Sequence, residues 1–297
     1  MNLIQAIILG IVQGLTEFIP ISSTAHLIFA SRLTNLHNGN AEQMTATIAV
    51  IQLGTLAAVF VYFAGDIWNI SYSFLRDHLS LLRRRGERRV FHGTHGIRPL
   101  WMSDETWLGW LIIIGSIPIG VVGLLLKDFI EGEATKNLWL IAAMMIAIAI
   151  LLWIAEQVGR RQKEMNRLGI FDAIIVGFAQ CIALIPGASR SGSTIMGGLF
   201  AGQTRETAAR FSFLLSIPAI LASGLLELKE AMEILPKENL TPLIVGTIVS
   251  GLVGYASIWF LLWYLRKRSN NIFIIYRIVV GAAILALLYY GVISPQA

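Results

Sequence analysis

The sequence has little charge and almost no cysteine. Only 14% of its 297 residues are charged, whereas 56% are hydrophobic and the mean hydropathy is +0.69. Soluble domains carry about 25% charged residues, so this composition excludes an ordinary soluble enzyme. Because Cys181 is the only cysteine, an internal disulfide is excluded. The first eight residues contain no basic side chain, which argues against a cleaved signal peptide.

Long apolar runs dominate instead. A spanning helix needs about 20 mostly apolar residues, and six stretches meet this test: 46–64, 107–126, 138–155, 207–226, 242–264 and 272–291. Segments 3–30 and 170–200 are also apolar, but Pro20 and Pro186 interrupt them. Non-helical backbone at membrane depth survives only where it is buried in protein or lines a wet cavity. We therefore expect these two segments to form broken helices or re-entrant hairpins and to carry the function.

The basic residues predict the orientation. Sixteen of the 23 Lys and Arg residues lie in 65–106, 156–169, 205–210 and 266–268, whereas 31–45, 127–137 and 227–241 together hold only five. Cytoplasmic loops are enriched in basic residues, so the first set is predicted to be cytoplasmic and both termini to lie outside. The Arg-rich stretch 76–98 could instead bind anionic lipid, but we favour a solvated loop. Glu17 and Arg190 are the charges expected away from loops and span ends.

A short repeat supports this topology. Ala6, Gly10 and Gln13 recur at the same spacing as Ala173, Gly177 and Gln180, and a proline and three spans follow each copy. An odd number of crossings inverts the second copy, as in many transporters. We predict an all-α polytopic membrane protein with a single membrane domain. It comprises inverted repeats 1–169, with an Arg-rich cytoplasmic loop at 65–106, and 170–297, each a re-entrant broken helix plus three transmembrane helices.

Small residues in the two interrupted segments have a structural interpretation. Gly10 and Gly14, and likewise Gly177 and Cys181, are four residues apart. This spacing allows helices to approach closely in a membrane. We therefore assign these residues to helix packing and not to chemistry.

The first interruption gathers ionisable and hydroxyl groups. Gln13 and Glu17 are one helical turn apart and face the same way. A carboxylate at membrane depth is costly unless it is paired or hydrated, so Glu17 is a candidate site residue. Ser22 and Ser23 could simply cap a second half-helix. If that helix begins near Ser22, His26 stands three residues beyond Ser23, close enough for its imidazole to reach the hydroxyl.

The second interruption predicts an anion site. Residues 186–194 contain several hydroxyls, small residues and one guanidinium, Arg190. Unpaired N–H groups at a helix N-terminus, together with hydroxyls and an arginine fork, suit an oxyanion such as phosphate. Alternatively, Arg190 merely neutralises Glu17 across the repeat interface, and both can hold in the resting state. Together the two interruptions hold what a phosphoryl-transfer site requires.

These residues also carry a family resemblance. The first motif comprises Gln13, Glu17, Pro20, Ser22, Ser23 and His26, and the second comprises Pro186, Gly187, Ser189, Arg190, Ser191, Gly192 and Thr194. Both resemble the signature motifs of the bacterial undecaprenyl-diphosphate phosphatase, or bacitracin-resistance protein, family. Further similarity at 51–54, 180–181 and 211–218 extends the resemblance over nearly the whole chain. Gln13 stands where many members have Glu, which weakens the case for two carboxylates sharing one metal.

The resemblance implies an activity and a location. The activity is hydrolysis of the C55 lipid carrier diphosphate to the monophosphate and inorganic phosphate, which recycles the carrier for cell-wall glycan synthesis and confers bacitracin resistance. A divalent cation, Mg²⁺ or Ca²⁺, supports the reaction. The location is the bacterial inner membrane, with the site opening to the outer, periplasmic face and the isoprenoid tail in an apolar groove. The oligomeric state stays open between a monomer and a homodimer.

The resemblance also implies residue roles. Glu17 is a metal ligand or base, Gln13 an auxiliary ligand, Arg190 the diphosphate clamp, and Ser23 and His26 are catalytic. The phosphate-binding hydroxyls are Ser22, Ser189, Ser191 and Thr194. We favour Ser23 as the nucleophile, with Glu17 or His26 taking its proton, because a hydroxyl beside a base is the usual activated arrangement. Attack by His26 or by a metal-bound water is the alternative.

A transporter or flippase of an isoprenyl phosphate lipid is the competing class. Inverted repeats whose broken helices meet near the midplane are a transport architecture, so topology alone does not decide. Clustering of Glu17, Ser23 and His26 opposite Arg190 exceeds what anion binding requires, and it therefore favours the phosphatase.

Overall fold

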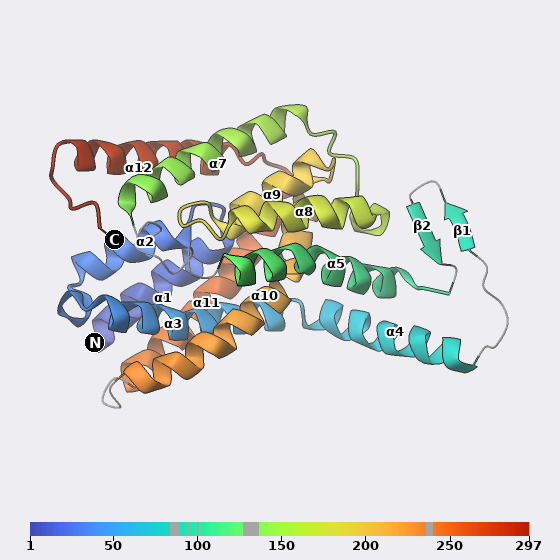
Figure 1. Ribbon diagram of the computed structural model, residues 1–297, viewed down its shortest axis with the longest axis horizontal. Helices are drawn as coiled ribbons and strands as arrows, with labels where there is room; N and C mark the ends of the chain where they lie inside the picture. Colours follow the sequence, from blue (N-terminus) through green and yellow to red (C-terminus); the bar gives the residue numbers. More distant parts are fainter. Residues whose placement is uncertain (84–89, 94–95, 100, 127–136, 236–239, 297) are drawn as a thin grey trace.

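The computed structural model is a bundle of helices that run roughly along one axis (Figure 1). It describes residues 1–83, 90–93, 96–99, 101–126, 137–235 and 240–296. Within these ranges the α-helices are α1 (Leu3–Phe18), α2 (Ser23–Leu33), α3 (Ala41–Tyr62), α4 (Ala64–Arg83), α5 (Asp104–Leu125), α7 (Leu138–Val158), α8 (Ile170–Ile182), α9 (Arg190–Phe200), α10 (Arg205–Ile234), α11 (Leu240–Leu265) and α12 (Asn271–Tyr289). Two 3₁₀ turns, η1 (Leu36–Gly39) and η3 (Met165–Arg167), complete the helical elements.

Among the described residues, six helices are long and apolar enough to cross a membrane. They are α3, α5, α7, α10, α11 and α12, and they coincide with the six predicted stretches. The prediction of six spans is therefore confirmed by length and composition. α1 and α8 are apolar but shorter than a span.

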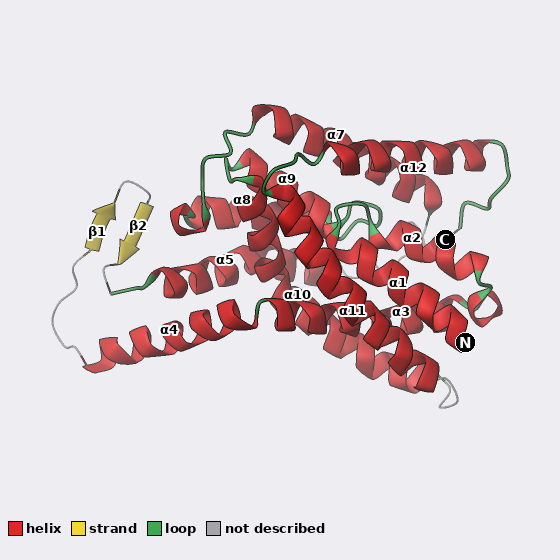
Figure 2. Ribbon diagram, turned by 180° about the vertical axis from the view of Figure 1, so that it is seen from behind, coloured by secondary structure: helices red, strands yellow, loops and turns green. Residues whose placement is uncertain are grey.

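Residues 65–106, predicted only as an Arg-rich connection, contain regular structure. α4 occupies its first part, and β1 (Val90–Gly93) pairs with β2 (Gly96–Pro99) in an antiparallel hairpin. This hairpin departs from the predicted all-α fold, although the rest of the described chain is helical. Figure 2 shows the hairpin at the far end of α4 and α5, opposite the two chain termini.

Asp77 joins α4 to the start of α5. Its carboxylate accepts hydrogen bonds from the Ser103 N–H and the Thr106 hydroxyl, each at 2.8 Å. Burial raises the pKa of this carboxyl, but these hydrogen bonds and the adjacent Arg76 outweigh burial and hold the pKa well below its usual range. The carboxylate therefore stays charged and caps the junction.

Many of the basic residues predicted to be cytoplasmic form ion pairs between span ends. Arg205 pairs with Glu156 at 2.7 Å, and the buried Glu156 also accepts from the Asn270 N–H at 2.9 Å. Arg210 pairs with Asp66 at 2.7 Å. These contacts tie α7, α10, the start of α12 and the α3–α4 junction together at one level of the bundle.

The interrupted segments each consist of two short helices. The first break separates α1 from α2 and the second separates α8 from α9. At each break a serine precedes the second helix with a positive φ, 78° at Ser22 and 68° at Ser189. Non-glycine residues seldom adopt such angles, so both serines are held by the surrounding structure.

Glycines let the short helices lie close to their neighbours. A side chain at Gly10 or Gly14 of α1 would clash with the α11 backbone, at Gly246 and Gly254 respectively. A side chain at Gly177 of α8 would come within 2.4 Å of the carbonyl oxygen of Gly115 in α5. Close backbone approach at small residues drives helix association in membranes. The predicted packing role of these glycines is confirmed.

Candidate active site

The end of α1 supplies a buried carboxylate. α1 ends at Phe18, just before Pro20, which has no N–H to continue the helix. Glu17 lies in this last turn and is 9% exposed. The Gln13 side-chain amide, one turn earlier, donates to the Glu17 carboxylate at 3.2 Å, so the two predicted partners do share a face. The oxygen of the Gln13 side-chain amide, Oε1, is buried without a hydrogen-bond partner in the described part of the chain.

The start of α9 supplies the guanidinium. Ser189 caps this helix by accepting from the Gly192 N–H at 3.2 Å, and Arg190 is the first helical residue. Gly187 before it has φ +90°, and a Cβ there would lie 2.3 Å from the Ile141 carbonyl oxygen. Only glycine fits this turn, which brings the chain back so that α9 begins beside α1.

Glu17 and Arg190 form an ion pair across the two breaks. The Arg190 Nη2 donates to the Glu17 carboxylate at 3.0 Å. The predicted neutralisation therefore exists. The Arg190 Nη1 is buried and has no hydrogen-bond partner in the ranges described. A buried donor without a partner is costly, so an anion that enters the site and accepts a hydrogen bond from this nitrogen would remove that cost.

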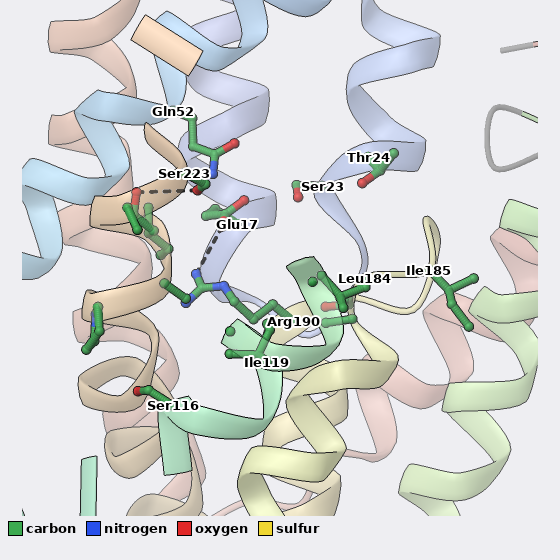
Figure 3. Close-up of a pocket in the computed structure, with 18 of the residues that line it drawn as sticks. Glu17, Ser23, Thr24, Gln52, Ser116, Ile119, Leu184, Ile185, Arg190 and Ser223 are labelled. Carbon is green, nitrogen blue, oxygen red and sulfur yellow. Dashed lines mark hydrogen bonds and ion pairs between the residues drawn. The ribbon is translucent and has the colours of Figure 1, made fainter. Parts of the chain in front are cut away.

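A cavity of about 720 Å³ opens beside this ion pair. Its polar wall comes from Glu17, Ser23, Thr24, Ser189 and Arg190. In Figure 3, Glu17 and Arg190 face each other, and Ser23 lies on the adjoining turn of α2. The cavity thus combines a carboxylate, hydroxyls and a guanidinium, the groups that bind and transfer a phosphoryl group.

His26 does not line this cavity. Its Nδ1 lies 2.7 Å from the Ser22 carbonyl oxygen, and its Nε2 lies 2.7 Å from the Tyr276 hydroxyl. Because a carbonyl only accepts, Nδ1 carries the proton, and in the neutral ring Nε2 accepts from Tyr276. The spacing argument expected the ring to reach Ser23. Instead the first turn of α2 directs it to the carbonyl four residues back.

The other predicted phosphate-binding hydroxyls lie outside the cavity wall. Ser22 is 1% exposed, and its hydroxyl has no partner in the described residues. The Thr194 hydroxyl donates to the Arg190 carbonyl at 2.7 Å and also contacts the Ser212 hydroxyl. Ser191 is buried beside Ser189, with 3.2 Å between the hydroxyl oxygens. In this structure none of these three residues lines the cavity.

Sequence reasoning missed Arg277 in α12. It is fully buried, with 0% exposure, and no carboxylate of the described residues pairs with it. Its guanidinium donates to the Pro20 carbonyl in the first break at 3.3 Å. It also donates to the second break, at the Gly187 and Ala188 carbonyls, at 2.9 and 3.0 Å. The Met145 carbonyl of α7 accepts from its Nε at 3.0 Å.

Arg277 therefore corrects the expectation that Glu17 and Arg190 are the only charges away from loops and span ends. The signal was in the sequence, because a charge inside an apolar span is a candidate functional residue by default. Gln52, Ser116 and Ser223 also line the cavity and were not predicted. Gln52 lies in the stretch 51–54 that shares the family resemblance, which was a signal for it, whereas Ser116 and Ser223 are single polar residues within spans and had no such pattern.

Known proteins resemble this chain over nearly its full length. The family described as "Bacitracin resistance protein BacA" matches residues 6–283. A protein named undecaprenyl-diphosphatase from Syntrophobacter fumaroxidans is 47% identical over 295 residues, which covers 99% of this chain and 100% of the relative. Undecaprenyl-diphosphatases from Chlorobium chlorochromatii and Nocardia farcinica are 47% and 45% identical, with 99% of this chain and 100% and 98% of the relatives covered.

The position of Arg277 predicts a large loss of stability when its guanidinium is removed. Arg277→Met leaves buried carbonyls of both breaks without a donor, at a cost of about 1–3 kcal/mol each. We expect the melting temperature of the detergent-purified protein to fall by about 5 °C or more. Arg277→Lys should not restore it, because one ammonium group cannot reach carbonyls on three elements.

Arg268→Met is the matched control. Arg268 is exposed just before α12, so its replacement should leave the melting temperature nearly unchanged. An Arg277→Met protein that melts with the wild type would refute a role for Arg277 in holding the two breaks.

Proposed function

Since the chain belongs to the bacitracin resistance protein BacA family and matches undecaprenyl-diphosphatases end to end, we propose that it hydrolyses undecaprenyl diphosphate to undecaprenyl phosphate and inorganic phosphate. It is a multi-pass membrane enzyme that returns the lipid carrier to cell-wall synthesis. The observation that carries the proposal is the Arg190 guanidinium, which is bound on one nitrogen by Glu17 and unpartnered on another beside the cavity.

Arg190 binds the diphosphate. Its Nη2 is fixed by Glu17, so the planar fork is already oriented when substrate arrives. Its Nη1 is free to donate to a phosphate oxygen, and the Ser189 hydroxyl lines the same wall. The positive end of α9 points toward this place as well, because Arg190 is its first residue. Negative charge that develops on the transferred phosphoryl group is stabilised by these donors.

Ser23 attacks the terminal phosphorus. A bond forms from its oxygen to that phosphorus while the bond to the bridging oxygen breaks, and undecaprenyl phosphate leaves. Glu17, which lines the same cavity, takes the Ser23 proton. Water then attacks the phosphorus of the phosphoserine, and the bond between the Ser23 oxygen and phosphorus breaks. The Ser23 oxygen takes back the proton held by Glu17, and inorganic phosphate leaves with the oxygen and protons of the water. Support for Ser23 over His26 comes from the cavity wall, which includes the serine hydroxyl and not the imidazole.

His26 acts through the turn that carries Ser23. Its Nδ1–H holds the Ser22 carbonyl, and Tyr276 holds its other nitrogen. The strained φ of Ser22 thereby persists and directs Ser23 into the cavity. His26 is a positioning residue in this proposal, and its loss misplaces the nucleophile.

Glu17 and Gln13 would hold the divalent cation. Their side chains offer carboxylate and amide oxygens, the hard ligands that Mg²⁺ and Ca²⁺ prefer. The Gln13 oxygen is buried and unpartnered within the described residues, so it can serve as a ligand without losing a hydrogen bond. No cluster of three acidic, His or Cys side chains exists in those residues, so Glu17 and Gln13 are the side chains that would hold the cation. A bound cation would neutralise phosphate charge.

The two halves are inverted repeats. α1 and α8 begin 167 residues apart, at Leu3 and Ile170, and α2 and α9 begin at the same separation, at Ser23 and Arg190. Ser22 and Ser189, with their matching positive φ angles, also correspond. α1 packs on α11 through glycines, as α8 does on α5. An odd number of spans per repeat makes the halves antiparallel, so the short helix pairs re-enter from opposite faces.

The site opens to the outer face. The chain termini lie at the end of the bundle opposite the β1–β2 hairpin (Figure 1). Arg160, Arg205, Arg210 and Arg266 occur at span ends and connections on the hairpin side, where basic residues mark the cytoplasm. The termini are therefore on the outside. The α5 residues that line the cavity belong to the half of the helix that ends at Leu125, away from the hairpin, so the cavity opens toward the same outer side.

Arg190→Lys should lower kcat/KM for C55 diphosphate by about 10²–10³-fold, because an ammonium cannot hold Glu17 and phosphate with the same planar fork. Phosphate release by the detergent-purified protein measures this. Arg210→Lys is the matched control, since Arg210 also pairs with a carboxylate but lies outside the cavity wall. Equal kcat/KM values for Arg190→Lys and the wild type would refute the proposal that Arg190 binds the diphosphate.

Ser23→Ala should lower kcat by at least about a thousandfold, whereas Ser31→Ala, on the same helix and away from the cavity, should not. Substrate labelled on its terminal phosphorus should leave an acid-stable phosphoserine on the wild type after rapid quenching. His26→Ala should be slow but should carry the same label. An acid-labile label, or a Ser23→Ala protein of near-normal rate, would exclude attack by serine.

The orientation is tested by cysteine labelling in a Cys181→Ala background. Arg160→Cys should react with a membrane-impermeant maleimide only after intact cells are permeabilised. Glu42→Cys, exposed at the start of α3, should react from outside. The opposite pattern would reverse the orientation of every span.

A further inference from the structure

The cavity lining differs between helices. Most of its polar groups come from the two breaks and from Gln52. After Ser116, α5 contributes only the apolar or small residues Ile119, Gly120, Gly123 and Leu124, and α10 contributes Pro218, Ala219, Ile220 and Ala222 besides Ser223. An amphiphile with an anionic head and a hydrocarbon chain matches this division. On the basis of the proposed function, we propose that the isoprenoid chain of the substrate leaves the site between α5 and α10, passing over Gly120 and Gly123.

The second half of α5 leaves room for such a chain. At Gly120 and at Gly123 an added Cβ would meet no atom of the described residues within 4 Å. Leu124, one position further, is 81% exposed. In contrast, Gly115, at the middle of α5, has so little space that a Cβ would lie 2.8 Å from the Leu215 side chain. The helix is thus closely packed before the cavity and open beside it.

The helices α5 and α10 meet just before this open stretch. Gly115 packs against Leu215, and the Ser116 hydroxyl lies 3.5 Å from the Leu215 carbonyl oxygen. Each helix then contains a proline, Pro118 and Pro218, at which an internal hydrogen bond is missing and helices commonly bend. α5 lines the cavity from Ser116 onward and α10 from Pro218 onward. The passage therefore begins where their direct packing is interrupted.

Continuity with the phosphate-binding end identifies the occupant. The same cavity includes Arg190 and Glu17, so a chain attached to a diphosphate bound there has its first units among the α5 and α10 residues. About 720 Å³ is a usual size for a small-ligand pocket. A C55 chain is too long to be enclosed in it, so most of the chain must pass the exposed Leu124 into the bilayer.

Such a passage would act on the substrate through the shape of its isoprenoid chain and not through hydrophobic free energy. Lipid tails are as apolar as the groove, so moving the chain from the bilayer to the protein yields little hydrophobic free energy. Its effect is instead to admit a slender chain and to orient the diphosphate for attack. Filling the space above Gly120 or Gly123 should therefore obstruct the chain without weakening the interaction of a bare headgroup with Arg190.

The test compares Gly120→Leu and Gly123→Leu with Gly65→Leu. Gly65, at the start of α4, also has open space around an added Cβ but lies outside the cavity wall. For each protein, kcat/KM is measured with C55 and C15 isoprenyl diphosphates, and the inhibition constant is measured for methylenediphosphonate, which has no chain. We expect kcat/KM to fall about 10-fold for both substrates in the two cavity variants, with the inhibition constant unchanged. Gly65→Leu should match the wild type.

Three results would each overturn the proposal. They are an unchanged kcat/KM in both cavity variants, an equal loss of kcat/KM in Gly65→Leu, and a weakening of methylenediphosphonate binding as large as the fall in kcat/KM. A wild-type protein that releases no phosphate would instead refute the proposed function. As an independent measurement, a C55 diphosphate analogue with a photoreactive diazirine in its second isoprene unit should label α5 and α10. Labelling confined to other helices would contradict this route whatever the variants do.

Discussion

One buried side chain satisfies the backbone at both helix breaks. A chain that leaves the helix inside a membrane exposes carbonyl groups that lipid cannot hydrogen-bond, and each must find a donor within the protein. Arg277 donates to Pro20 in the first break and to Gly187 and Ala188 in the second, and it anchors both to α7 through Met145. Because these contacts converge on one guanidinium, the breaks lie side by side.

The reactive groups follow from that convergence. With the breaks together, the last turn of α1 and the first residue of α9 bring Glu17 and Arg190 to 3.0 Å, although they are 173 residues apart in the chain. Two arginines thus have separate tasks. Arg277 has several carbonyl partners and is enclosed, whereas one Arg190 nitrogen beside the cavity has no partner among the described residues. In the proposed function the unsatisfied Arg190 nitrogen binds substrate, and Arg277 holds the two breaks together.

Much of this could be predicted from the sequence, because membrane length and helix-breaking residues impose strong patterns. The six spans and the breaks near Pro20 and Pro186 were predicted and are present. The pairing of Glu17 with Arg190 was considered as an alternative to anion binding, and it is present as well. The direction of His26 was not, since it depends on whether the ring prefers a carbonyl four residues back or a hydroxyl three residues back. Arg277 was visible in the sequence as a charge inside an apolar span, but its partners are backbone carbonyls, so no side-chain pattern indicated that it joins the two breaks.

The central claim is that the converged breaks bind an isoprenyl diphosphate by its head. A structure of the protein with a non-hydrolysable isoprenyl methylenediphosphonate tests this most directly. Our account predicts phosphonate oxygens at the Arg190 Nη1, Ser23 within reach of the terminal phosphorus, and the chain between α5 and α10. A diphosphonate bound away from Arg190, with the Glu17–Arg190 pair and the cavity unchanged, would contradict it.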